Sequence, residues 1–177
     1  MKYTDKQIDE TIEGVFSGKL STDNLPEDLY LAISDNLKSG LYKGFGGDLG
    51  KFEGKDFELL KELRENIYMF SGAKAYQQVR EMSDLLQGPD GLRSLSEFKE
   101  AALEIYKTYN ETWLETEYKT AVGQGASAVA WQQIQEVKDV LPFLKYDAIQ
   151  DERTSEICSG LNGLIAPVDS PLWDKYA

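Results

Sequence analysis

The residues best suited to chemistry in this sequence are two carboxylates and a guanidinium at Asp151, Glu152 and Arg153. They could form a general acid–base group. They could instead be structural, with a carboxylate capping the following turn and the arginine pairing with a carboxylate. We favour the structural role, because the sequence shows no partner nucleophile or base.

Two further patterns raise the same choice between a site and a structural feature. Glu111 and Glu115 lie four residues apart, on one face of an expected helix, where carboxylates are usually just solvated. The glycine-rich residues 40–54 lack the strand before, and the Lys-Ser/Thr pair within, that a phosphate-binding loop needs. We therefore expect a flexible or partner-binding loop there rather than a nucleotide site.

The composition narrows the possible functions. With no histidine and the single cysteine Cys158, the chain cannot build a Ser-His-Asp or Cys-His system, a His-rich zinc site or an internal disulfide. A net charge of −12 disfavours direct binding to nucleic acid. No apolar run approaches the roughly 20 residues of a membrane span, and no signal peptide opens the chain, so a soluble protein made in a cytoplasm is expected.

Periodicity predicts helices over the first two thirds of the chain. Thr4 with Gln7 and Ser94 with Glu97 resemble capping boxes. A second helix should follow Pro26, and a long one should start near Asp56. Residues 88–91, Gly-Pro-Asp-Gly, are typical of a turn.

We expect the helical residues 94–141 to pack as an antiparallel or broken pair. Their apolar side chains recur at spacings of three and four. This packing should bury Tyr109, Trp113, Ala130 and Ile134.

After Pro142 the pattern changes. Residues 144–149 alternate in a way that is typical of a short strand, and Leu-Ile at 164–165 is a candidate second strand. The predicted fold is therefore mainly α, with a small α/β module at the C-terminal end. We expect an N-terminal helical region at 1–92 and a helical lead-in with the small module at 93–177.

Several short motifs in the second half resemble the phage Mu F-like minor head proteins of the phage head-morphogenesis family. They are Trp-Leu-Glu-Thr-Glu-Tyr at 113–118, Pro-Phe-Leu-Lys-Tyr at 142–146, Asp-Glu-Arg-Thr at 151–154, Leu-Asn-Gly at 161–163 and Pro-Val-Asp-Ser-Pro-Leu-Trp at 167–173. Their order and spacing make the resemblance fairly specific. The residues that it marks as structural or partner-binding are Trp113, Glu117, Tyr118, Tyr146, Asp151, Glu152, Arg153, Leu161, Gly163, Pro167, Asp169 and Trp173.

The resemblance implies a minor component of a tailed-phage or prophage head, acting near the portal in procapsid morphogenesis. The expected partners are portal or other capsid and scaffold proteins, with no cofactor, small-molecule substrate, membrane or direct nucleic-acid contact. The host cytoplasm during assembly, and then the virion head, are the expected locations. The family's C-terminal domain is also similar to the ADP-ribosyltransferase fold, so an enzyme or toxin domain of that class is the alternative, although we expect no enzymatic activity.

The sequence departs from the family pattern at two points. Cys158 stands where many relatives carry histidine, and the family's Cys-Arg-Cys motif would lie beyond Ala177. The resemblance therefore implies a piece of a longer protein. One cysteine cannot hold zinc alone, so Cys158 is either a small apolar filler here or a metal ligand only in a longer chain.

Overall fold

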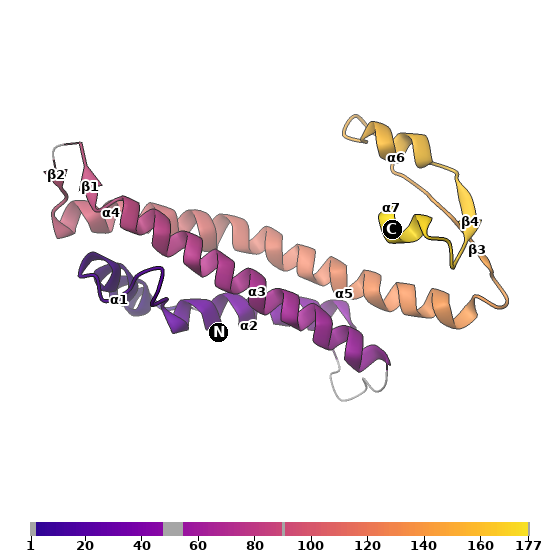
Figure 1. The fold of residues 1–177 in the computed structure, drawn as a ribbon, viewed down its shortest axis with the longest axis horizontal. Helices are drawn as coiled ribbons and strands as arrows, with labels where there is room; N and C mark the ends of the chain where they lie inside the picture. The colour runs from indigo at the N-terminus through magenta and orange to yellow at the C-terminus, as the bar shows by residue number, and fades with distance from the viewer. Residues whose placement is uncertain (1–2, 48–54, 90, 177) are drawn as a thin grey trace. The chain divides into compact units, whose positions relative to one another are not determined.

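The computed structural model describes residues 3–47, 55–89 and 91–176, and its contacts divide the chain into a unit of residues 1–128 and a unit of residues 129–177. The predicted fold class is confirmed: helices dominate, and the sheets are two small antiparallel pairs (Figure 1). The predicted boundary at 92/93 rests on motifs and stays a prediction. None of the described helices combines the length and the apolar composition that a bilayer crossing needs.

Both predicted capping boxes begin helices. In α1 (Asp5–Phe16) the Thr4 side chain accepts from the Gln7 backbone while the Gln7 side chain accepts from the Thr4 backbone. Ser94 and Glu97 do the same at α4 (Leu95–Lys107). Each box satisfies two backbone donors that the first helical turn leaves open.

The α3 helix (Lys55–Asp84) runs without a break through Ser71 and Gly72. It joins α4 through a tight hairpin of β1 (Gln87–Gly88) and β2 (Gly91–Leu92), which confirms the predicted turn, although Asp90 lies outside the described residues. Helix α1 packs on α3 and α4 and buries Ile12 and Val15. Helix α4 buries Phe98, whose ring centroid lies 5.4 Å from that of Phe16 in α1.

The prediction of a helical pair over residues 94–141 is wrong. The chain passes from α4 through a π-helical segment, η2 (Thr108–Trp113), directly into α5 (Leu114–Val137) without reversing. Of the side chains expected to be buried, Tyr109 is buried, whereas Trp113 and Ala130 are exposed and Ile134 is half-buried. A π-helical turn holds more residues than an α-helical one, so the predicted apolar stripe does not continue on one face beyond Tyr109.

The glycines at 40 and 44 are not in a loop, because α2 (Glu27–Gly44) continues to Gly44. Gly46 and Gly47 follow with positive φ, and residues 48–54 of the predicted loop lie outside the described residues. A Cβ built on Gly40 would lie 2.9 Å from the Tyr118 carbonyl oxygen, and one on Gly44 would meet the Val122 carbonyl oxygen. These glycines therefore let the backbones of α2 and α5 touch.

The second unit holds β3 (Phe143–Lys145), α6 (Glu156–Leu161), β4 (Ile165–Pro167) and α7 (Leu172–Tyr176). The two strands pair antiparallel with Leu144 opposite Ala166. They confirm two short strands near the expected positions, each shifted by a residue or more. In the described part of this unit the buried hydrophobic residues are Ala166, Val168 and Trp173.

Gly125→Ala should destabilise the protein because the new Cβ would lie 2.5 Å from the Leu41 carbonyl oxygen, across the α2–α5 contact. We expect a loss of about 1–3 kcal/mol in the free energy of unfolding, as for other overpacked contacts. Gly123→Ala is the matched control, since a Cβ there meets nothing within 4 Å and alanine favours the helix by about 0.5–1 kcal/mol. Urea denaturation of both variants checks this, and a raised midpoint for Gly125→Ala would contradict the close contact.

Candidate functional site

A ladder of polar side chains joins α3 to the η2–α5 region. The Tyr109 hydroxyl donates to Glu81 Oε1 at 2.7 Å, and Asn110 Nδ2 donates to Gln78 Oε1 at 2.6 Å. Further along, Lys74 Nζ pairs with Glu117 Oε2. The residue numbers decrease along α3 as they increase along η2 and α5, so these contacts fix an antiparallel register between the two segments.

The π-helical segment explains how two adjacent residues, Tyr109 and Asn110, both reach α3. In a regular α-helix neighbouring side chains point about 100° apart, whereas a widened turn brings more of them to one side. Burial, together with the hydrogen bond to Glu81, raises the pKa of Tyr109 to about 12. The ring of Trp113 packs on Tyr109 with centroids 4.5 Å apart and stays 45% exposed.

The Lys74–Glu117 ion pair is the most buried one among the described residues, with side chains 4% and 21% exposed. Burial lowers the pKa of Lys74, and the hydrogen bond and charge of Glu117 oppose that shift. A buried ammonium without a partner costs several kcal/mol, so Glu117 is needed to keep Lys74 charged in this position.

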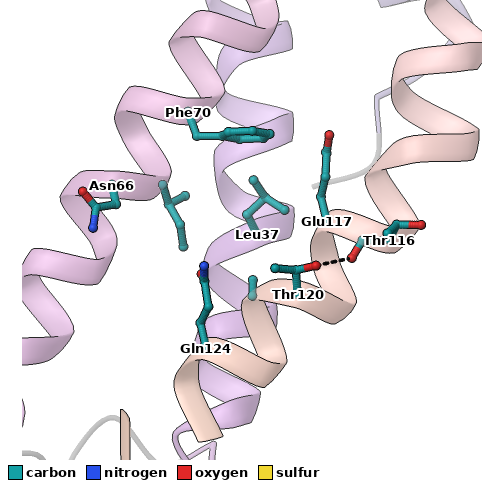
Figure 2. Close-up of a pocket in the computed structure, with 9 residues that line it drawn as sticks. Leu37, Asn66, Phe70, Thr116, Glu117, Thr120 and Gln124 are labelled. Atoms are coloured by element: carbon teal, nitrogen blue, oxygen red, sulfur yellow. Dashed lines mark hydrogen bonds between the residues drawn. The ribbon is translucent and has the colours of Figure 1, made fainter. Parts of the chain in front are cut away.

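Glu117 also borders a groove between α2, α3 and α5, which we call the three-helix groove. Its volume is about 460 Å³. Figure 2 shows Leu37 from α2, Phe70 from α3, and Glu117 and Gln124 from α5 around it. The whole lining consists of Leu37, Asn66, Ile67, Phe70, Thr116, Glu117, Thr120, Ala121 and Gln124.

The groove is lined by both apolar and polar side chains. Its floor is apolar, with Leu37, Ile67 and Ala121 buried. The Thr120 hydroxyl donates to the Thr116 carbonyl oxygen at 3.0 Å, within its own helix. Nothing in the described lining pairs a nucleophile with a base.

Tyr118, the third sequence-predicted residue of the first unit, packs over Gly40. A Cβ on that glycine would lie 3.0 Å from Tyr118 Cδ2. Glu117 and Tyr118 therefore take part in the α2–α3–α5 packing, whereas Trp113 is exposed.

The Asp151 motif forms a turn, as its structural interpretation predicts. Asp151 Oδ1 accepts from the Arg153 backbone at 2.9 Å, and the Asp151 backbone donates to Thr154 Oγ1 at 2.9 Å. The side chains of Glu152 and Arg153 are exposed, and Arg153 makes no ion pair with any residue that the structure describes. The expected pairing of this arginine with a carboxylate is thus not seen.

Tyr146 and Gly163 continue the pairing of β3 and β4 beyond Lys145 and Ile165. The Gly163 backbone, at φ +84°, donates to the Tyr146 carbonyl oxygen at 2.8 Å, a conformation that favours glycine. The Tyr146 hydroxyl lies 3.5 Å from Cys158 Sγ on α6, where Leu161 is half-buried. Hydrogen bonds from Ser155 and Tyr146 lower the pKa of the Cys158 thiol.

The Pro167–Trp173 motif closes the hairpin. The Trp173 indole nitrogen donates to the Pro167 carbonyl oxygen at 2.7 Å, and Lys138 Nζ lies 2.9 Å from Asp169 Oδ1. The described residues hold no cluster of three or more His, Cys, Asp or Glu side chains suited to a metal ion. The sequence-predicted residues of this unit lie in and around the β3–β4 hairpin, in the turn at Asp151, and in α6 and α7.

Sequence reasoning missed two features, the buried polar residues of α3 and the exposed apolar side chains of the second unit. The polar residues of α3, at positions 74, 78 and 81, lie at helical spacing and could have been identified as a polar stripe. The exposed large apolar side chains of the second unit gave no such signal, because the sequence does not distinguish an apolar strand residue that faces solvent from one that faces a core.

No family model, curated protein or solved structure matches the chain.

Removing Glu117 should cost more than removing an exposed carboxylate on the same helix. Glu117→Gln leaves the Lys74 ammonium without a counter-charge, and we expect a loss of about 1–3 kcal/mol in the free energy of unfolding. The double variant Lys74→Met/Glu117→Leu should recover most of it, because no buried charge remains.

Glu115→Gln provides the control, since the Glu115–Lys119 pair has both side chains about 70% exposed. An exposed pair contributes at most about 1 kcal/mol. Chemical denaturation of the wild-type protein and the three variants checks these expectations. Equal losses of unfolding free energy in Glu115→Gln and Glu117→Gln would refute a structural role for the buried pair.

Proposed function

We propose that the protein is a non-enzymatic assembly protein of a tailed-phage or prophage head, acting near the portal in procapsid morphogenesis. In this proposal it works in the host cytoplasm during assembly and stays in the virion head. The unit of residues 129–177 binds a portal protein. The order and spacing of the motifs between Trp113 and Trp173, which resemble phage Mu F-like proteins, support this choice.

One observation carries the proposal: the second unit exposes more large apolar side chains than it buries. Residues 1–128, where described, bury eighteen hydrophobic residues and expose eight large ones, whereas the described residues of the second unit bury three and expose eight. These eight are Val137, Val140, Leu141, Phe143, Ile149, Ile157, Leu164 and Ile165. A unit of this size gains stability by burying such surface on a partner.

The strand register places part of this surface on one face. Phe143 lies opposite Pro167 and Lys145 opposite Ile165, so these four side chains share the side that points away from Ala166. We call this the outer sheet face. Phe143 and Ile165 are diagonal neighbours and are 61% and 64% exposed.

Charge indicates what kind of partner fits. Residues 129–177 carry eight acidic and four basic residues, and the chain as a whole carries a net charge of −12. A second copy would bring like charges together, which opposes self-association. The partner in this proposal is therefore a portal surface with an apolar centre and a rim of Lys and Arg side chains.

Phe143→Ser/Ile165→Ser should abolish capture of the cognate portal protein in a pull-down. Loss of two apolar anchors at an interface centre weakens binding by about 30-fold or more. The matched control is Met69→Ser/Leu92→Ser, which removes two side chains of the first unit that are 75% and 80% exposed. Equal weakening by both double variants, or no capture by the wild-type protein, would contradict the proposal.

Incubation with labelled NAD separates this function from the ADP-ribosyltransferase alternative. We expect no label transfer to phage or host proteins, because the sequence offers no histidine and no nucleophile–base pair. Reproducible transfer of label by the purified protein would overturn the non-enzymatic assignment.

A further inference from the structure

The hydrogen bonds of the β3–β4 hairpin show which backbone groups of β3 face its partner strand. The Val168 N–H donates to the Pro142 carbonyl oxygen at 2.9 Å, and the Tyr146 N–H donates to the Leu164 carbonyl oxygen at 2.8 Å. In an antiparallel pair, opposed residues alternate between hydrogen-bonded and non-hydrogen-bonded pairs. Leu144, halfway between these two bonds, is therefore the residue of β3 that bonds to β4.

Phe143 and Lys145 direct their backbone N–H and C=O groups to the other side of β3, away from β4. Neither backbone has a hydrogen-bond partner on that side among the residues that the structure describes. The side chains of both residues are exposed. We call this row of backbone donors and acceptors the β3 edge.

The opposite edge of the hairpin, along β4, is closed at Pro167. Proline has no N–H to donate. Its carbonyl oxygen already accepts from the Trp173 indole at 2.7 Å and from the Ser170 backbone at 3.0 Å. An additional strand can therefore bond at successive outward positions along β3 but not along β4.

The side chains at the β3 edge restrict which strand fits there. Phe143 is 61% exposed and lies diagonal to Ile165 on the outer sheet face, so a strand added to β3 would cover its open side. A lysine on an edge strand opposes pairing with an apolar strand of another molecule. Lys145 makes no ion pair with any described residue, and a carboxylate opposite it would remove that obstacle.

We propose that the β3 edge binds an extended strand of the portal protein, which joins the hairpin as a third strand. On the outer sheet face that strand carries an apolar side chain beside Phe143 and a carboxylate beside Lys145, two residues apart. This inference rests on the proposed function and specifies how the second unit binds.

A second copy of the chain fits the β3 edge less well. Its own β3, Phe-Leu-Lys, offers no carboxylate to Lys145. Its net charge of −12 also repels an identical chain. The occupant in this proposal is therefore a strand of a different protein.

Hydrogen exchange with residue resolution, on the whole chain alone and bound to the cognate portal protein, tests the added strand. In the free protein the Leu144 and Tyr146 amides, which bond to β4, should exchange about 10-fold more slowly than those of Phe143 and Lys145. In the complex the Phe143 and Lys145 amides should slow to the rate of Leu144.

The outcomes separate this inference from the proposed function. No capture of the wild-type chain by the portal protein would overturn both. Capture in which the Phe143 and Lys145 amides still exchange as in the free protein would overturn the added strand alone. A dimer of the free chain that Lys145→Pro disperses would show that a second copy occupies the edge, and would also overturn it.

Lys145→Pro, compared with Lys145→Ala, distinguishes an added strand from docking on the outer sheet face alone. Both variants remove the ammonium group, but only proline removes the outward N–H and places a ring against the incoming strand. We expect Lys145→Ala to weaken capture by up to about 5-fold. Lys145→Pro should weaken it at least about 10-fold more. Equal weakening by the two variants would contradict the added strand.

The hairpin itself should tolerate this proline, because the Lys145 N–H does not bond to β4. Slow exchange of the Leu144 amide in the free Lys145→Pro variant verifies that β3 and β4 remain paired. If that amide exchanges fast, the exchange pattern of the wild-type complex decides alone.

Discussion

The direct contact between the backbones of α2 and α5 is the constraint on which the first unit depends. Gly40 and Gly44 on one helix and Gly125 on the other leave no space for a side chain between them. Beside this contact, Leu37 of α2 and Ala121 of α5 line the three-helix groove.

The polar ladder complements that contact by fixing how α3 lies along the η2–α5 region. Buried polar groups cost free energy unless they are paired, so alternative registers that leave Lys74 or Gln78 unpaired are disfavoured. The two units thus differ in kind. Where described, the first unit buries eighteen hydrophobic residues, whereas residues 129–177 bury three and expose eight large apolar side chains. A fixed scaffold and a binding module are the division of roles that we propose.

Sequence reasoning succeeded where structure depends on neighbouring residues. The capping boxes at Thr4 and Ser94 and the turn after Gly88 are local, and all three form. It failed where the partner is distant in the chain. Glycine is common both in loops and in close helix contacts, and only the presence of α5 decides that Gly44 is helical. Trp113 was expected to be buried, but it lies in the π-helical segment, where the wider turn changes which residues share a face.

The central claim is that residues 129–177 carry the binding surface, and hydrogen exchange of the complex with the cognate portal protein tests it most directly. Amide protection should increase from residue 139 through β3 and in β4, where apolar side chains are exposed in the free chain. The amides of α2 and α3 should exchange as they do without the portal protein. Protection confined to α2 and α3, with residues 139–145 unchanged, would contradict the account.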